Sequence, residues 1–271
     1  MTGRGVSHGC ISVMNGIVSG TGAVIGIALR TEAMYSEEGK TQRVEIRSTE
    51  GTDDTLARIC VRRTLERIGA DPDAGYVLTI DSEIPPSRGL KSSSSVCNAA
   101  VSAVLAHHGF AMDTLDMIKL GVECAKEAGV TVTGSFDDAC GCELGGFIVT
   151  DNYRNEILRR EPFGKCEVIL CIPDHIKIRI PKERYNAVSS EMEEIKEVCR
   201  TDPIKAMTMN GRLIARVTGS GGDLIEEALA HGALAAGVSG TGPAVAALAE
   251  PGEGKRIADA LGCRTVITET R

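Results

Sequence analysis

The sequence has 271 residues, enough for one large domain or two small ones at about 150 residues per domain. Its 42% hydrophobic and 25% charged residues are typical of a globular protein with a buried core, which excludes wholesale disorder. A net charge of −7 with no Trp, 4 Tyr and 4 Phe argues against nucleic-acid binding, because phosphate-seeking charge and stacking surfaces are both lacking.

The first part of the sequence alternates predicted strands and helices. Residues 10–34 predict two apolar strands around a glycine-rich turn at 19–22. Helices are predicted over 53–69, 92–108 and 114–128, and strands over 76–84 and 146–150. The helix over 53–69 has two acidic residues near its start, apolar residues at three- and four-residue spacing, and a glycine at its end.

Near residue 160 the composition changes, and EPFGK at 161–165 is typical of a linker. Beyond it, strands are predicted over 167–173, 244–249 and 264–268, and helices over 188–200, 203–217, 222–232 and 254–261. Another glycine-rich turn precedes residue 244. Helices and strands are mixed in both parts, so we predict two α+β domains, over residues 1–160 and 161–271.

The ten cysteines are spread over the whole sequence and include no CxxC pair. No apolar run reaches the roughly 18–20 residues of a membrane span, and MTGRGVSHGC at the start lacks the apolar part of a secretion signal. We therefore expect a cytoplasmic protein with reduced thiols and no membrane partner. His107 and His108 are adjacent and should point in different directions on a helix, so no metal site of His and Cys is expected.

The segment PPSRGLKSSSSVCN, residues 85–98, follows a predicted strand and begins an apolar helix. Gly89 permits a tight turn, and serines at 92–95 occupy the first helical turn, where backbone N–H groups have no partner within the helix. Such a helix start favours anions, and the hydroxyls and Lys91 add donors and a cation. A serine-rich cap without a ligand is the alternative. The Gly-Leu-Lys turn and the double proline favour a phosphate-binding loop, although neither GxxxxGK[ST] nor GxGxxG occurs.

This loop resembles the P-x-x-x-G-L-x-S-S phosphate loop of the GHMP kinase superfamily, which includes galactokinase, homoserine kinase, mevalonate kinase and phosphomevalonate kinase. GVSGTGPA at 237–244 is similar to the superfamily's C-terminal glycine-rich motif, and the stretch with Asn15 and the turn at 20–26 is similar to its first motif. The resemblance runs from about residue 5 to about residue 250. It implies the two-domain α+β GHMP kinase fold, with ATP bound between the domains.

The resemblance places the ATP phosphates along the serine-rich loop and has the C-terminal glycine loop close the site. The residues that it assigns to ATP are Pro86, Ser87, Arg88, Gly89, Leu90, Lys91, Ser92, Ser93, Ser94, Ser95, Gly240, Thr241 and Gly242.

Two carboxylates follow from the spacing in mevalonate-kinase-like members, in which a Glu lies eleven residues before a catalytic Asp and a Gly-Gly pair begins seven residues after it. Here Glu127 lies eleven residues before Asp138 and Gly145 seven after it, so both spacings select Asp138 over Asp137. The resemblance implies that Asp138 accepts or orients the proton of the substrate hydroxyl, and that Glu127 and Ser93 hold Mg²⁺, which prefers hard oxygen ligands. A solvated turn or helix cap is the alternative for the Asp pair alone.

Within the superfamily, GLKSSS at 89–94 and EAGVTVTGSFDDA at 127–139 are similar to archaeal shikimate kinases. This resemblance implies that the chain phosphorylates the 3-hydroxyl of shikimate with ATP and Mg²⁺. Homoserine or a mevalonate-pathway alcohol is the alternative acceptor. A non-catalytic ligand-binding protein is a third hypothesis, against which the presence of both Glu127 and Asp138 argues.

The sequence departs from its relatives in two places. Several relatives carry a Lys near the N-terminus that helps to activate the hydroxyl, whereas the matching region here offers Arg4 and His8. Most relatives have a small residue where Lys91 stands, and we predict that Lys91 supplies the missing cation as a second catalytic residue. The candidates for binding the shikimate carboxylate are Arg4, Arg88, Lys182 and Arg184. A homo-oligomer is compatible with the sequence.

Overall fold

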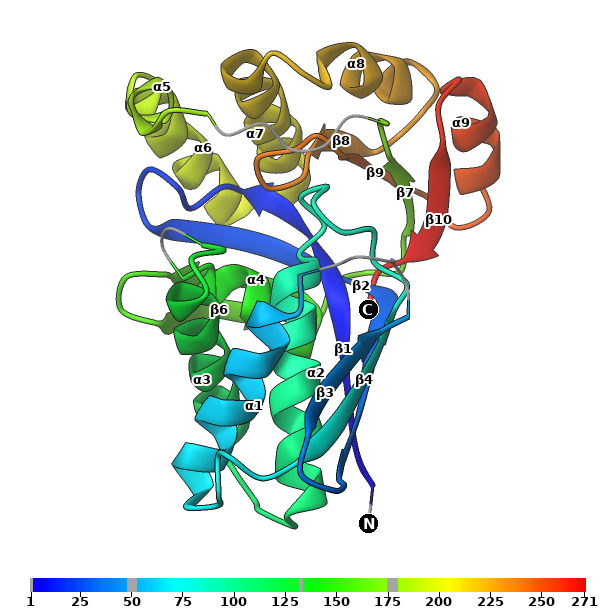
Figure 1. Cartoon of the computed structure of the whole chain (residues 1–271). Helices are drawn as coiled ribbons and strands as arrows, with labels where there is room; N and C mark the ends of the chain where they lie inside the picture. Colours follow the sequence, from blue (N-terminus) through cyan, green and yellow to red (C-terminus); the bar gives the residue numbers. More distant parts are fainter. Residues whose placement is uncertain (1, 48–52, 132–133, 175–179) are drawn as a thin grey trace.

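The structure is a computed structural model that describes residues 2–47, 53–131, 134–174 and 180–271 (Figure 1). Each half of the chain forms a sheet covered by helices. In the view of Figure 1, the first half is the lower part and the second half the upper part. Among the described residues, no helix has the length and apolar character needed to cross a membrane.

The first sheet has six strands in the order β3-β4-β2-β5-β6, with β1 also paired to β2. Its strands are β1 (Gly3–Met14), β2 (Thr21–Glu37), β3 (Gln42–Ile46), β4 (Tyr76–Ser82), β5 (Phe147–Asp151) and β6 (Glu156–Glu161). Its helices are α1 (Thr55–Ile68), α2 (Ser92–His107), α3 (Thr114–Glu127) and α4 (Phe136–Leu144). Only β3 and β4 are parallel, and the central helix α2 packs on β1 and β2.

Close packing of α2 on β1 depends on two glycines in the strand. A Cβ atom on Gly3 would lie 2.1 Å from the carbonyl oxygen of Ala103, and one on Gly5 would lie 2.1 Å from that of Ala99. The strand backbone therefore lies directly against the helix backbone, which only glycine permits. This contact fixes the position of α2, whose first turn carries the serine-rich loop.

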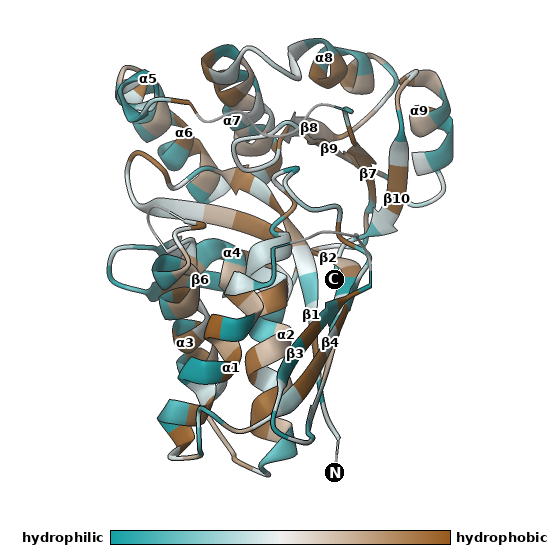
Figure 2. Ribbon diagram, viewed as in Figure 1, coloured by the Kyte–Doolittle hydropathy of each residue, from teal (hydrophilic) through white to brown (hydrophobic). Residues whose placement is uncertain are grey.

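The second sheet is antiparallel, in the order β10-β7-β9-β8. Its strands are β7 (Glu167–Cys171), β8 (Ala235–Val238), β9 (Val245–Ala249) and β10 (Thr265–Glu269). Its helices are α5 (Lys182–Asn186), α6 (Ser189–Thr201), α7 (Pro203–Thr218), α8 (Gly222–Ala230) and α9 (Gly254–Ala260). The residues of β8 and β9 are all buried, which matches their small apolar side chains. Figure 2 shows the hydrophobic colour along β7 and β9.

One hydrophobic cluster is continuous across the two halves of the chain. It joins Ile11 and Val13 of β1 and Ile25 of β2 to β7, β9 and the inner faces of α6 and α7. A second cluster lies between the first sheet and α1–α4. The first sheet ends at Glu161 and the second begins at Glu167, while the core itself runs on between them. The predicted boundary between residues 1–160 and 161–271 lies between the two sheets, but the hydrophobic core is not interrupted there. The division into two domains therefore stays a prediction.

Candidate active site

A cavity of about 760 Å³ opens beside the start of α2. It is bordered by the end of β1, the start of α4, and the glycine loop that follows β8. The predicted site residues that line it are Pro86, Ser87, Gly89, Lys91, Ser92, Ser93, Ser94, Asp138, Gly240 and Thr241. Asp137, which the spacing argument sets aside, lines it as well.

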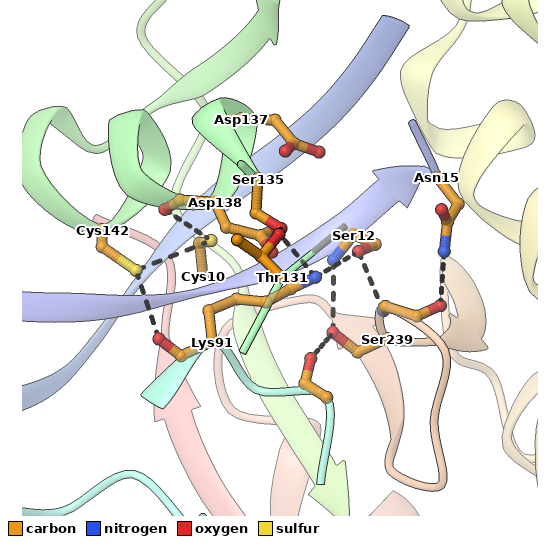
Figure 3. Close-up of polar contacts among 12 residues, drawn as sticks. Cys10, Ser12, Asn15, Lys91, Thr131, Ser135, Asp137, Asp138, Cys142 and Ser239 are labelled. Atoms are coloured by element: carbon orange, nitrogen blue, oxygen red, sulfur yellow. Dashed lines mark hydrogen bonds and ion pairs between the residues drawn. The ribbon is translucent and has the colours of Figure 1, made fainter. Parts of the chain in front are cut away.

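Lys91 and Asp138 form a buried ion pair in this cavity (Figure 3). The Nζ atom of Lys91 lies 2.9 Å from Oδ1 of Asp138, and it donates a hydrogen bond to the Oγ atom of Ser12 at 2.8 Å. The Lys91 side chain is only 6% exposed. Lys91 directly precedes α2 and Asp138 belongs to the first turn of α4, so the fold brings together two residues that the sequence analysis assigns to catalysis.

The electrostatics of this pair keep Lys91 charged. Burial disfavours the ammonium form, but the nearby carboxylates of Asp138 and Asp137 outweigh that effect and raise the pKa of Lys91 above its usual value. Lys91 is therefore a fixed cation that cannot serve as a proton acceptor at neutral pH. Of the pair, the carboxylate of Asp138 is the group able to accept a proton.

Asp137 is buried beside Asp138, at the start of the same helix. The side chain of Asn152 donates to Oδ1 of Asp137 at 2.9 Å, and a Cβ atom on Gly22 would lie 2.0 Å from Oδ2. Burial, and then the charge of Asp138, raise the pKa of Asp137 to about 7. Asp137 is thus buried and hydrogen-bonded, and both aspartates lie in the cavity wall as well as in the first turn of α4.

The loop before α2 has the backbone expected of an anion-binding turn. Ser87, Gly89 and Lys91 have φ values of 57°, 81° and 67°, which lie in the left-handed region. A Cβ atom on Gly89 would lie 2.2 Å from the carbonyl oxygen of Ser239, so this position requires glycine for two reasons. The hydroxyl of Ser239 donates to the carbonyl of Gly89 at 2.9 Å, which joins the loop to the residue before Gly240.

Ser12 and Asn15 connect the glycine loop to the strand β1. The backbone N–H of Gly240 donates to Oγ of Ser12 at 2.9 Å, and Nδ2 of Asn15 donates to the carbonyl of Gly240 at 2.8 Å. Ser12 thus contacts both Lys91 and the glycine loop, although the sequence analysis does not single it out. The one sequence signal that could have identified Ser12 is its hydroxyl within the otherwise apolar run Ile11–Met14.

The N-terminal basic residues lie elsewhere. Arg4 forms an ion pair with Glu32 at 2.7 Å and is more than half exposed, and neither Arg4 nor His8 lines the cavity. The position of β1 that faces Lys91 is occupied by Ser12 instead. Lys91 is the basic residue that lines the cavity, and its replacement of an N-terminal Lys stays a prediction.

Two thiols lie beneath the ion pair. The Sγ atom of Cys10 contacts the carbonyl of Asp138 at 3.5 Å, and Sγ of Cys142 lies 3.9 Å from the carbonyl of Lys91 and 3.9 Å from Sγ of Cys10. Burial raises the pKa of the Cys10 thiol well above its usual value. Both thiols pack against the backbone of the charged residues.

Several predicted residues lie outside the cavity wall. Leu90 is part of the hydrophobic core, Ser95 is buried within α2, and Gly242 belongs to the glycine loop without lining the cavity. The guanidinium of Arg88 donates to the carbonyl of Asp174 at 3.0 Å. None of these four residues lies in the cavity wall.

Glu127, the predicted metal ligand, is also separated from the other site residues. It is the last residue of α3, and its carboxylate pairs with the guanidinium groups of Arg62 and Arg63 on α1. The side chain is 41% exposed and does not line the cavity, whereas Ala125 and Ala128 beside it do. The spacing argument selects the last residue of α3, and in the structure its carboxylate faces α1.

The candidates for binding a substrate carboxylate are likewise absent from the cavity wall. Arg184 donates to the carbonyl of Val217 at 3.4 Å, and none of Arg4, Arg88, Lys182 and Arg184 lines the cavity. Within the part of the chain that the structure describes, Lys91 is the only basic residue in the cavity wall.

Two solved structures share this architecture over nearly the whole of both chains. Mevalonate kinase from Methanococcus jannaschii has a TM-score of 0.79 and 19% sequence identity, covering 100% of this chain and 98% of that one. Homoserine kinase from Cytophaga hutchinsonii has a TM-score of 0.73 and 18% identity, covering 100% of this chain and 94% of that one. At these identities the likeness establishes the fold alone.

Sequence relatives identify the family. The model of the GHMP kinases N terminal domain matches residues 54–146, and that of the GHMP kinases C terminal domain matches residues 192–267. Shikimate kinase of Methanothrix thermoacetophila is 39% identical over 273 residues, covering 98% of this chain and 93% of the relative. Shikimate kinase of Methanothermobacter thermautotrophicus is 36% identical over 263 residues, covering 94% and 89%.

The chain belongs to the GHMP kinase family and is a kinase. The predicted resemblance and the predicted mixed α and β fold are confirmed. Its relatives among the archaeal shikimate kinases match it over nearly the whole length of both chains.

Proposed function

We propose that this chain transfers the γ-phosphoryl group of ATP to the 3-hydroxyl of shikimate, forming shikimate 3-phosphate in the cytoplasm. The observation that carries the proposed chemistry is the buried ion pair of Lys91 and Asp138 at the start of α2. The choice of shikimate is supported by relatives of that name at 34–39% identity. The chain's ten free cysteines suit a reducing cytoplasm.

The start of α2 is suited to the phosphates of ATP. Ser92, Ser93 and Ser94 present hydroxyls to the cavity from a helical turn whose N–H groups have no partner within the helix. The donor set of hydroxyls, backbone N–H groups and one ammonium is that of a phosphate site. Gly240 and Thr241 border the same cavity, so the glycine loop would cover the nucleotide.

Asp138 would act on the acceptor hydroxyl. In phosphoryl transfer the protein mainly positions the reactants and stabilises charge. One further group accepts or orients the proton of the acceptor hydroxyl. Because Lys91 stays protonated, we assign the proton to the carboxylate of Asp138. Lys91 would then neutralise charge on the transferring phosphoryl group, within hydrogen-bond reach of the same carboxylate.

The chemistry of the cavity wall supports the use of Mg²⁺. Its hydroxyl and carboxylate oxygens are the hard ligands that this ion prefers, and they come from Ser93, Asp53 and Asp137. Mg²⁺ bound there would neutralise phosphate charge during transfer. Glu127 would reach the ion only by leaving Arg62 and Arg63, so we assign the metal first to Ser93 and the cavity carboxylates.

The test is steady-state kinetics of the purified chain with ATP and Mg²⁺. Shikimate, homoserine and mevalonate are compared as acceptors at matched concentrations. We expect turnover with shikimate and little with the other two. Preference for homoserine or mevalonate would contradict shikimate as the acceptor but not the kinase activity. Absence of turnover with all three would contradict kinase activity toward any of these acceptors.

A further inference from the structure

A cluster of Glu37, His107 and His108 lies at the end of the first half that is remote from the cavity. Glu37 ends β2, His107 ends α2, and His108 follows α2 as its C-cap residue. Figure 1 shows α2 running from the middle of the molecule to its lower end. A helix of 16 residues is about 24 Å long, so the cluster is well separated from the phosphate loop at the other end of α2.

The three side chains present ligand atoms to one another at distances that a metal ion would bridge. Nε2 of His108 lies 3.2 Å from Oε1 of Glu37, and Nε2 of His107 lies 3.9 Å from Oε2 of Glu37. One ligand atom from each residue lies within 4.8 Å of both others. A tetrahedral ion with bonds of about 2.0–2.1 Å holds its ligand atoms roughly 3.3 Å apart, so small side-chain adjustments suffice.

Two imidazole nitrogens in this cluster are buried without a hydrogen-bond partner. They are Nδ1 of His107 and Nε2 of His108. The second nitrogen is close to the Glu37 carboxylate, yet the two atoms do not meet in hydrogen-bonding geometry. Buried polar atoms seldom lack a partner. A cation between Nε2 of His108 and the Glu37 carboxylate would give each of these two groups a partner.

Packing holds the two rings in place. The ring of Tyr35 is fully buried and lies edge-on to the His107 ring, with centroids 5.1 Å apart. The two histidine rings are 4.9 Å apart and nearly perpendicular. The expectation that adjacent histidines point apart is wrong here, because α2 ends at His107 and His108 begins the next turn of chain. Both rings therefore contact Glu37.

We propose that Glu37, His107 and His108 bind one divalent transition-metal ion of the Zn²⁺ type. Two imidazoles and a carboxylate suit Zn²⁺, whereas Mg²⁺ prefers oxygen ligands alone. Glu37 is 39% exposed, so water can complete the coordination from the solvent side. The ion would join the end of β2 to the end of α2, and its role would be to stabilise the fold independently of phosphoryl transfer.

The test uses the full chain, reduced and freed of metal, with Zn²⁺ as the probe. Calorimetry is expected to give one ion per chain. Glu37→Gln and His108→Gln should each weaken binding by at least about tenfold, since even the outer partners of metal ligands contribute roughly 10- to 100-fold. The matched controls are Glu38→Gln, the next carboxylate along the chain, and His231→Gln, an exposed histidine, and both should bind as the unmodified chain does.

Two further measurements separate this cluster from the cysteines and from binding to the unfolded chain. Co²⁺ as a coloured probe distinguishes the cluster from the ten cysteines, because a thiolate ligand adds a charge-transfer band that imidazole and carboxylate do not. Zn²⁺ should also raise the unfolding temperature of the unmodified chain and not that of Glu37→Gln. Equal Zn²⁺ affinity in all variants, no binding at all, or a cobalt spectrum dominated by thiolate would each overturn the proposal.

Discussion

Asn152 holds Asp137 through both its backbone and its side chain. Oδ1 of Asn152 accepts the backbone N–H of Asp137 at 2.9 Å, and Nδ2 donates to the Asp137 carboxylate at 2.9 Å. The hydroxyl of Thr150 donates to the same Oδ1 at 2.7 Å, which fixes the orientation of the amide. A buried carboxyl group with a pKa of about 7 is thereby held beside Asp138, and it titrates in the range where the enzyme would work.

The first prediction concerns pH and stability. The pKa of Asp137 is higher in the folded chain than its ordinary value of 3.8, so its contribution to stability is complete below about pH 4 and is lost as the pH rises through about 7. The unfolding temperature should therefore fall between about pH 5 and about pH 8, and fall less in Asp137→Asn. Thermal unfolding at both pH values checks this, with the exposed Asp81→Asn as control. Equal pH dependence in Asp137→Asn and the unmodified chain would contradict it.

Asp138→Asn should lower kcat roughly 10²- to 10⁴-fold, the usual loss for a missing general base. The KM for ATP should change little, because the carboxylate acts on the acceptor hydroxyl rather than on the nucleotide. Steady-state kinetics with shikimate measures both values. A variant with near-normal turnover, alongside an inactive Asp137→Asn, would show that the neighbouring aspartate carries the reaction.

Lys91→Gly and Lys91→Met should each lower turnover with shikimate by at least about tenfold, because both remove the cation beside the reacting phosphate. Both also leave Asp138 buried without its partner, and breaking a buried pair costs about 3–5 kcal/mol. Glycine tolerates the φ of 67° at this position, so Lys91→Gly should unfold at a higher temperature than Lys91→Met. Activity and thermal unfolding measured together check the two claims, and unchanged turnover would make Lys91 a structural residue only.

Gly89→Ala should destabilise the chain more than Gly39→Ala does. Both glycines have a left-handed φ, and alanine there costs about 1–2 kcal/mol. Only at Gly89 would the new Cβ collide with the carbonyl of Ser239, since nothing lies within 4 Å of a Cβ on Gly39. Urea unfolding compares the free energies of the two variants, and nucleotide binding should weaken in Gly89→Ala alone. Equal losses of unfolding free energy in the two variants would mean that backbone strain alone explains why Gly89 must be glycine.

Glu127→Gln should leave the Mg²⁺ concentration for half-maximal activity unchanged, because this carboxylate pairs with Arg62 and Arg63 outside the cavity. Ser93→Ala should raise that concentration, since Ser93 lies in the cavity wall. The measurement is activity titrated with Mg²⁺ at fixed ATP. A shift in Glu127→Gln would show that Glu127 leaves its arginines and reaches the ion when the nucleotide binds.

The sequence predicts those helices and strands that are long and whose apolar residues recur with a regular period. The helices α1, α2, α3 and α7 begin and end within two residues of their predicted limits. Aspartate precedes α1, α3 and α7, and glycine follows α1 and α7, whereas α2 begins with the run of serines. The first residues of β1 are not predicted as a strand, because glycine has no preference for strands. Gly3 and Gly5 are instead required by the close contact of β1 with α2. The strand β8 resembles a glycine-rich turn for a related reason: Gly237 lies against Gly211 of α7.

The candidate site shows the same limit in another form. Local chemistry predicts an anion-binding loop at the start of α2, and motif spacing selects Asp138. Lys91 and Asp138 are far apart in the sequence, and their pairing depends on how α4 packs beside α2. The orientation of Glu127 depends in turn on arginines from α1, which no local pattern relates to the end of α3.

The continuous core between the two halves has a consequence for motion. Ile11, Val13 and Ile25 of the first sheet pack with β7 and β9 of the second, so a hinge that separated the halves would expose buried apolar surface. Substrate would then enter at the rim of the cavity, which the serine-rich loop and the glycine loop border. The overall dimensions of the chain in solution should accordingly stay the same when nucleotide and shikimate bind, as small-angle scattering would register.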